Sequence, residues 1–166
     1  MDTTTQAAVA AVRKSITVQA DVQRAFEVFT AEFDMWWPRS HHIGKSPMKK
    51  AIVEGRAGGR LYSEQVDGTG CDWGTVLVWE PPHRFVWAWQ ISAQWQFEPD
   101  LTKASEVEVR FTAEPGGKTR VDLEHRHLER HGMDAAAVRT AIDSPNGWGT
   151  LLQMFAETVD RGSSRC

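Results

Sequence analysis

Three large aromatic side chains alternate with smaller residues in the segment HRFVWAWQI, which covers residues 83–91. Phe85, Trp87 and Trp89 are two positions apart, and side chains two apart on a β-strand project to the same face. Burying the three rings, at about 200 Å² each, is worth roughly 15 kcal/mol before the cost of ordering the chain. The spacing therefore predicts a strand whose aromatic face must be covered by another layer of the protein.

The same period of two recurs along most of the chain. Val107, Val109 and Phe111 alternate with charged residues, which is typical of an antiparallel strand with one buried face. Turn sequences rich in Gly and Pro separate such segments from one another. The predicted strands cover residues 12–20, 51–55, 60–66, 73–80, 83–91, 105–115 and 118–128.

Two longer segments instead show apolar residues at helical spacing. Asp21 is suited to cap a helix, and an aromatic stripe follows it over residues 22–33. Near the end of the chain, Ser144 as the cap and Pro145 at the first helical position predict a longer helix with a sustained apolar stripe. A short helical segment is expected from about Asp134. This order of elements predicts an α+β fold with the helices packed on one face of the sheet.

Composition limits the domain organisation and the partners. The chain has 166 residues, a formal net charge of -3 and scattered basic residues, which argues against nucleic acid as a partner. No apolar run is long enough for a membrane span, so no membrane partner is expected. No linker divides the chain, and we expect one domain over residues 12–161 with flexible ends at 1–11 and 162–166. Cys71 and Cys166 are interpreted as free thiols of a cytoplasmic protein.

Five segments, in this order, resemble the SRPBCC superfamily (START-like, helix-grip), specifically the branch named for the activator of Hsp90 ATPase. They are VQADVQRAFEVFT (18–30), WWPRSHHIG (36–44), WEPPHRFVWAW (79–89), TRVDLEHRHL (119–128) and NGWGTLLQMF (146–155). The resemblance covers about residues 12–160. It implies a START or Bet v 1-like curved antiparallel sheet of about six to seven strands around the C-terminal helix, with a largely apolar cavity between them. Stimulation of Hsp90 is not carried over, because 166 residues leave no room for the co-chaperone's extra N-terminal domain.

With that cavity as the expected site, the eight tryptophans become candidates for its walls. Flat indole rings suit a hydrophobic or aromatic ligand, while core packing is the alternative role for each of them. Arg39 and His41, in the loop after the first helix, are expected at the mouth, facing a ligand carboxylate or phosphate, or else as solvated loop residues. The candidate ligand-binding residues are Trp36, Trp37, Arg39, His41, Trp73, Trp87, Trp89, His125, Trp148, Leu152 and Phe155.

His125 and His127 extend the apolar row of their predicted strand. Facing a cavity, the neutral imidazole of His125 would form a hydrogen bond with a ligand, whereas in a core it would be paired with a neighbouring group. The two histidines also suggest a metal site, because two imidazoles two positions apart on a strand can bind one ion. No third ligand can be identified, however, and we predict no metal and no cofactor. Glycine-rich nucleotide loops and serine or cysteine nucleophile motifs are absent from the sequence.

Three functional hypotheses follow. The first is the binding of a small hydrophobic molecule without covalent chemistry, so that we expect a binding protein rather than an enzyme. The second is a cyclase or dehydratase that uses His125 as its general acid or base in the same cavity. The third is a protein-interaction module similar to an Hsp90 co-chaperone. A homodimer is left open, and Hsp90 itself is not expected as a partner.

Overall fold

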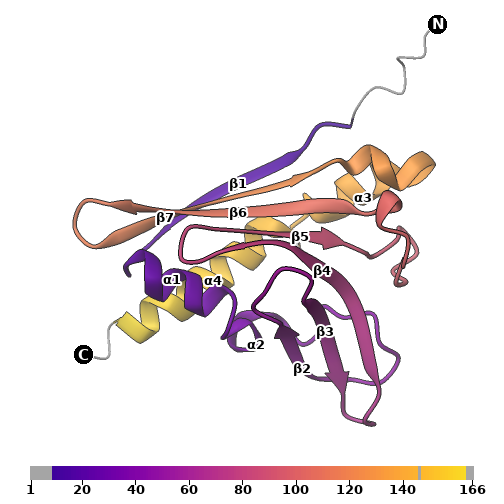
Figure 1. The fold of residues 1–166 in the computed structure, drawn as a ribbon, viewed down its shortest axis with the longest axis horizontal. Coiled ribbons are helices and arrows are strands. Elements are labelled where there is room, and N and C mark those ends of the chain that lie inside the picture. Colours follow the sequence, from indigo (N-terminus) through magenta and orange to yellow (C-terminus); the bar gives the residue numbers. More distant parts are fainter. Residues whose placement is uncertain (1–8, 146, 164–166) are drawn as a thin grey trace, which may run out of the picture.

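One antiparallel sheet of seven strands, in the order β1-β7-β6-β5-β4-β3-β2, forms the body of the protein. The computed structural model describes residues 9–145 and 147–163 (Figure 1). The strands are β1 (Val12–Val18), β2 (Met48–Val53), β3 (Arg60–Gln65), β4 (Gly70–Glu80), β5 (Arg84–Trp89), β6 (Ser105–Glu114) and β7 (Lys118–Arg126). The helices are α1 (Val22–Phe29), α2 (Phe33–Trp36), α3 (Ala135–Ile142) and α4 (Trp148–Ser163), with 3-10 turns η2 (Leu101–Lys103) and η3 (Leu128–Asp134). The predicted α+β class and helix-grip order are confirmed.

The aromatic stripe after Asp21 is divided between two short helices. The Asp21 carboxylate accepts a hydrogen bond from the Arg24 backbone N–H at 2.9 Å, as expected of a helix cap. Helix α1 ends just before Thr30, whose hydroxyl donates to the Phe26 carbonyl 2.7 Å away. The chain becomes helical again at Phe33, in α2. The prediction of one continuous helix over residues 22–33 was therefore wrong.

Helix α4 begins later than expected. Ser144 and Pro145 were predicted as its first residues, but the Ser144 hydroxyl donates to the Ala141 carbonyl at 2.7 Å and belongs to the end of α3. The connecting turn passes through Gly147, where a Cβ atom would lie 2.0 Å from a carbonyl oxygen of α3. Only glycine fits there, and the tight turn lets α4 start at Trp148, close to α3.

The sheet bends most in the half that β2, β3, β4 and β5 form. The pairing register shifts once in each of the pairs β2–β3, β3–β4 and β4–β5, and such irregularities increase the local twist and bend of a sheet. In Figure 1, β2 and β3 accordingly turn away from the long strands β1, β6 and β7. Helix α4 packs against β1, α1 and α2.

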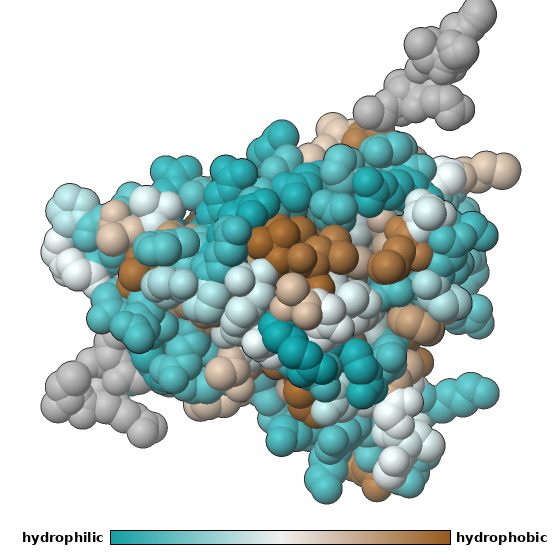
Figure 2. All heavy atoms as spheres, in the orientation of Figure 1, coloured by the Kyte–Doolittle hydropathy of each residue, from teal (hydrophilic) through white to brown (hydrophobic). Residues whose placement is uncertain are grey.

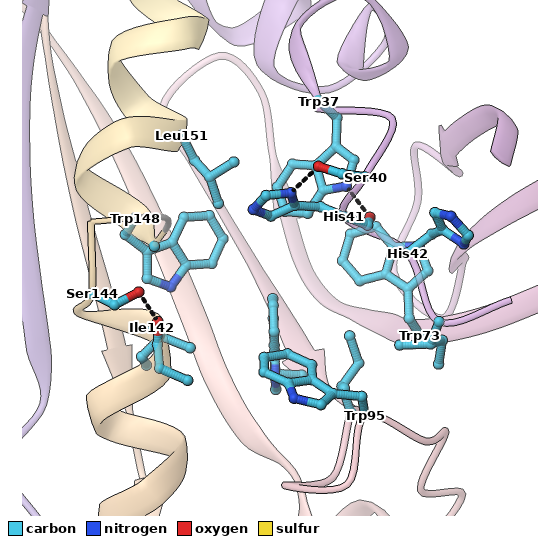
Figure 3. Close-up of a pocket in the computed structure, with 15 residues that line it drawn as sticks. Trp37, Ser40, His41, His42, Trp73, Trp95, Ile142, Ser144, Trp148 and Leu151 are labelled. Carbon is cyan, nitrogen blue, oxygen red and sulfur yellow. Dashed lines mark hydrogen bonds between the residues drawn. The ribbon is translucent and has the colours of Figure 1, made fainter. Parts of the chain in front are cut away.

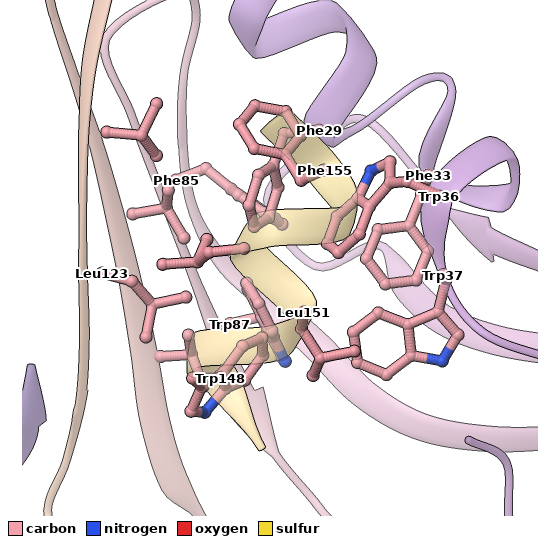
Figure 4. Packing of buried hydrophobic residues seen from close by; sticks show 14 of the residues in the cluster. Phe29, Phe33, Trp36, Trp37, Phe85, Trp87, Leu123, Trp148, Leu151 and Phe155 are labelled. Atoms are coloured by element: carbon pink, nitrogen blue, oxygen red, sulfur yellow. The ribbon is translucent and has the colours of Figure 1, made fainter. Parts of the chain in front are cut away.

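The hydrophobic core lies between α4, the two N-terminal helices and the sheet (Figure 4). Phe85 and Trp87 of β5 are fully buried there and stack with ring centroids 4.9 Å apart. Phe29 of α1 meets Phe155 of α4 edge-to-face at 5.1 Å, and both rings are fully buried. The cover that the alternating aromatics of β5 require is thus supplied by α1 and α4.

The opposite face of the sheet carries charges that pair with one another. Glu108 of β6 accepts hydrogen bonds from Arg84, Arg110 and Arg126 at 2.5, 3.1 and 2.6 Å. Burial opposes ionisation of Glu108, but these bonds outweigh it and lower its pKa to about 2. Figure 2 shows hydrophilic side chains gathered over β1, β6 and β7. This face is therefore stabilised by internal ion pairs.

The expected flexible ends, residues 1–11 and 162–166, fall largely outside the described residues, as does Cys166. Cys71 is a free thiol. Over the described ranges, no helix is long and apolar enough to span a membrane.

Candidate functional site

A cavity of about 480 Å³ opens beside the first turn of α4 (Figure 3). Its walls come from the loop after α2, the start of β4, the end of β5 and the segment that follows it, and the turn between α3 and α4. The lining is mostly apolar and consists of Trp37, Ser40, His41, His42, Ile43, Trp73, Trp89, Ile91, Trp95, Ala141, Ile142, Ser144, Gly147, Trp148 and Leu151. The final helix therefore leaves a hollow between itself and the sheet.

Four of the five tryptophans in the cavity contact one another and form a continuous wall. Trp37 stacks on Trp73, with ring centroids 5.6 Å apart and planes inclined by 15°. Trp73 meets Trp89 edge-to-face at 6.2 Å, and Trp89 meets Trp148 in the same way at 5.8 Å. Because each ring is braced by its neighbours, the wall is a preformed aromatic surface.

Five of the eleven candidate binding residues line this cavity: Trp37, His41, Trp73, Trp89 and Trp148. Four others lie in the hydrophobic core and do not line the cavity: Trp36, Trp87 and Phe155, which Figure 4 labels, and Leu152. The Trp36 N–H donates to the Val28 carbonyl at 3.1 Å, which holds that ring away from the cavity. Successive helical residues point about 100° apart, which is why Leu151 faces the cavity while Leu152 packs in the core.

Trp95 lines the cavity although nothing in the sequence analysis singled it out. It lies in a small hairpin after β5, in which the Ser92 N–H donates to the Gln96 carbonyl at 2.8 Å. The period of two in β5 continues here, because Ile91, Ala93, Trp95 and Phe97 alternate with the polar Ser92, Gln94, Gln96 and Glu98. This alternation was an available signal that was not used.

Arg39 does not line the cavity. Its guanidinium binds the Asp34 carboxylate through two hydrogen bonds of 2.7 and 3.0 Å, and Asp34 also accepts the Ala51 N–H at 2.8 Å. Burial opposes the charge of Asp34, but the bonds from Arg39 and Ala51 prevail and lower its pKa. Arg39 therefore joins α2 to β2 through Asp34.

His41 does reach the cavity, and its backbone positions part of the wall. Its carbonyl accepts the Trp37 indole N–H at 2.7 Å, and its Nδ1 atom lies 3.0 Å from the Ser40 hydroxyl. Figure 3 shows Ser40 and His41 on one side of the cavity, with Trp95 across from them. His41 and His42 are thus the titratable side chains that the cavity presents.

His125 is fully buried and is joined to three other side chains by a chain of hydrogen bonds. The Trp148 indole N–H donates to His125 Nδ1 at 3.0 Å, so the imidazole proton resides on Nε2. Nε2 then donates to the Ser105 hydroxyl oxygen at 2.7 Å, and this hydroxyl donates to His131 Nε2 at 2.8 Å. The direction of the whole chain follows from the indole, which can only donate.

The burial of this chain keeps its histidines uncharged. Burial is the main cause that lowers the pKa of His125, to about 3, and the neighbouring His131 lowers it further. Burial also lowers the pKa of His131, against the opposing charge of Asp134. His125 does not line the cavity and both of its ring nitrogens are engaged. It positions Trp148 and lacks the access that a general acid or base needs.

His127 does not extend the buried row as expected. Its backbone is left-handed, with φ 59°, and its ring nitrogens lie 3.9 and 3.7 Å from carboxylate oxygens of Glu106 and Glu129. Among the residues that the structure describes, no group of three or more His, Cys, Asp or Glu side chains is placed to hold a metal ion.

A second, smaller cavity of about 110 Å³ adjoins the first. The two share five lining residues: Trp89, Ile91, Trp95, Ala141 and Ile142. Trp95 therefore borders both spaces.

The geometry of a bent sheet, a C-terminal helix and a cavity between them agrees with comparisons to known proteins. The family model described as activator of Hsp90 ATPase homolog 1-like protein matches residues 19–160. The chain belongs to this family. The predicted family is thereby confirmed, although membership does not assign Hsp90 as a partner.

Among solved structures, the anthrahydroquino-γ-pyrone synthase Txn09 is 42% identical to the chain, with a TM-score of 0.65, and the match covers 92% of this chain and 98% of Txn09. CalC from Micromonospora echinospora, a self-sacrificing resistance protein, is 33% identical, with a TM-score of 0.68 and coverage of 94% and 97%. The Aha1 dimer from Colwellia psychrerythraea, at 14% identity, a TM-score of 0.60 and coverage of 93% and 98%, shares the fold. None of the curated proteins is significantly similar in sequence.

Proposed function

We propose that the protein binds a small aromatic molecule in the cavity beside α4. The observation that carries this proposal is that five tryptophans line one cavity of about 480 Å³. This volume lies within the range of about 300–1,000 Å³ that small-molecule sites occupy. Flat aromatic walls gain most from a ligand that is itself flat and apolar, because stacking adds to the area removed from water.

The relatives support this proposal. Txn09 is a synthase of an anthrahydroquino-γ-pyrone, and its identity of 42% extends over nearly all of both chains. The lining residues also fit a binding role, since the cavity is mostly apolar and has only a few polar side chains, those of Ser40, His41, His42 and Ser144. We therefore place the ligand of this protein among aromatic, multi-ring compounds.

A pair of matched variants on α3 tests the proposal. Ala141 lines both cavities, whereas Ala136 lies on the same helix, is exposed and lines neither. Ala141→Phe should fill the cavity and weaken binding of an aromatic probe at least tenfold, while Ala136→Phe should bind like the wild type. Quenching of intrinsic tryptophan fluorescence by anthracene-2-carboxylate and anthraquinone-2-carboxylate measures this. The proposal fails if the wild type binds neither probe, or if Ala141→Phe binds both unchanged.

Catalysis in the same cavity is a second candidate, favoured by the identity to a synthase. His125 is not available for it, so an acid or base would have to come from His41 or His42, which line the cavity. Conversion of a polyketide-type precursor, followed by mass spectrometry, distinguishes the two candidates. If His41→Gln and His42→Gln retain probe binding and abolish conversion, the protein is an enzyme. A ligand whose mass and chromatographic retention are both unchanged after incubation with the wild type supports binding alone.

A further inference from the structure

The indole N–H groups of the cavity wall fall into two classes. The N–H groups of Trp37 and Trp148 are already used inside the protein, by the His41 carbonyl at 2.7 Å and by His125 at 3.0 Å. Those of Trp73 and Trp89 have no hydrogen-bond acceptor in the part of the chain that the structure describes. The wall therefore contains two indole donors that the protein itself leaves unpaired.

These two donors differ from the unpaired indole of Trp87. Trp87 Nε1 is fully enclosed in the core and is the one such buried nitrogen without a partner among the described residues. Trp73 and Trp89 are almost as buried, at 5% and 6% exposed, yet their nitrogens are not enclosed in this way. Both side chains line the cavity, and Trp89 also lines the smaller one.

We infer that Trp73 and Trp89 donate hydrogen bonds to oxygen atoms on the rings of the ligand. This inference rests on the proposed function and narrows the ligand to flat, multi-ring aromatic compounds that carry carbonyl or similar acceptor oxygens. A ligand that displaces water from an N–H group without replacing its hydrogen bond leaves a buried donor unpaired, at a cost in affinity. The same cost gives selectivity, because a site built to hydrogen-bond its ligand rejects an analogue that lacks the acceptor.

Trp95 supplies a stacking face for such a ligand. Its side chain is 54% exposed although it borders both cavities, and no other described aromatic ring contacts it. Its backbone is left-handed, with φ 59°, a conformation that is rare for a bulky residue and is found where the surrounding structure enforces it. Figure 3 shows Trp95 across the cavity from Ser40 and His41, with Trp148 and Trp73 at the flanks. A flat ligand that enters this space has Trp95 as one face of its site.

Two probes that differ only in the acceptor oxygens test the inference. Anthraquinone-2-carboxylate and anthracene-2-carboxylate share the three-ring frame and the carboxylate, but only the former carries two ring carbonyls. Neutral hydrogen bonds of this kind are worth a factor of about three to ten, so the wild type should bind the anthraquinone more tightly by that factor. In a Trp73→Phe and Trp89→Phe double variant this preference should fall to about one. Isothermal titration calorimetry measures both affinities without relying on the tryptophans removed.

Three further variants separate the donors from the aromatic wall. Trp95→Leu should weaken both probes by about three to ten because it removes the stacking face, whereas Trp95→Phe, which keeps a ring and removes the indole N–H, should keep the preference for the anthraquinone. Trp79→Phe is the control: Trp79 packs against Phe26 at 5.1 Å, does not line either cavity, and should leave both affinities unchanged. If near-UV circular dichroism shows that the double variant is not folded, each single Phe variant should lose part of the preference.

The possible results distinguish this inference from the proposed function. Retention of the preference in folded Phe variants, or equal affinity of the wild type for both probes, would overturn the inference and leave the proposed function intact. Failure of the wild type to bind either probe would overturn the proposed function, and the inference with it. A Trp95→Leu variant with unchanged affinities would remove Trp95 from the site.

Discussion

Acid should destabilise this protein well before its carboxylates protonate, because His125 is held neutral in the core. The pKa of a histidine is near 6.5 in an unfolded chain and is lowered to about 3 here, mainly by burial. A lowered histidine pKa means that stability is fully present above pH 6.5 and is lost progressively as the pH falls toward 3. Over that range the unfolded chain takes up a proton that the folded protein does not.

The size of the effect follows from the pKa difference. One pH unit below 6.5 costs about 1.4 kcal/mol for one such group, so lowering the pH from 7 to 5 should reduce the free energy of unfolding by about 2 kcal/mol through His125 alone. His131 acts in the same direction, because burial lowers its pKa as well, against the charge of Asp134. Glu108 contributes only at lower pH, since its pKa is already lowered to about 2.

Urea denaturation at pH 7, 6 and 5, followed by tryptophan fluorescence, measures this dependence. His125→Gln is the appropriate variant, because an amide has both a donor and an acceptor for the partners of His125 and does not titrate over this range. The variant should be less stable at pH 7 but should lose about 2 kcal/mol less than the wild type between pH 7 and pH 5. Parallel pH dependences for wild type and variant would show that His125 is not the buried neutral group described above.

Three further predictions concern packing and pairing. Gly74→Ala should lower the free energy of unfolding by about 1–3 kcal/mol in urea, because its Cβ atom would lie 2.7 Å from the Ala88 carbonyl oxygen. Glu108→Gln should lower the free energy of unfolding by about 2 kcal/mol at pH 7. The wild type has this stability above about pH 4.5 and loses it as the pH falls toward 2, so the difference between the two proteins should shrink over that range in acid titrations. Trp148→Phe should leave the His125 ring without its indole donor, and should reduce both the unfolding free energy, by about 1–3 kcal/mol, and the affinity for an aromatic probe in calorimetry.

The fold was predictable because its signals are local and repeated. Alternation along β6 and helical spacing in α4 depend only on which residues are apolar, and both signals survive in the structure, whereas β5 is buried on both faces, with Val86 and Ala88 each 2% exposed. The hydrophobic pattern failed at helix boundaries, where a single residue determines the end or the start of the helix. Helix α1 stops before Thr30, whose hydroxyl bonds to the Phe26 carbonyl, and α4 starts only after the tight turn at Gly147, where any Cβ atom would clash with α3. No periodicity reveals either feature.

The cavity was predictable only in part, for a related reason. Hydrophobic residues of wall and core look alike in sequence, so Trp87 and Trp89 received the same assignment although one is in the core and the other lines the cavity. The two are two positions apart on one strand face, and the difference arises from what packs above each of them. Trp148 contacts both rings, but Trp87 is also covered by Phe29 of α1, whereas Trp89 has no contact with the rings of α1 and borders the cavity. Contacts between segments distant in sequence therefore determine whether a tryptophan lies in the core or lines the cavity.

The wall of the cavity is held in place by the protein before a ligand binds, and this has a consequence for affinity. Trp148 is fixed by His125, Trp37 by the His41 carbonyl, and Trp73 by its stack on Trp37. A ligand that meets fixed rings does not have to order them, so little of the stacking energy is lost to side-chain entropy. Trp95 lacks such ring contacts in the described chain and is half exposed. Binding of a ligand would therefore reduce the side-chain entropy of Trp95, and this loss would weaken the affinity. Selectivity for flat, oxygen-bearing ligands should therefore reside in the fixed wall, while Trp95 should affect the strength of binding to all flat ligands alike.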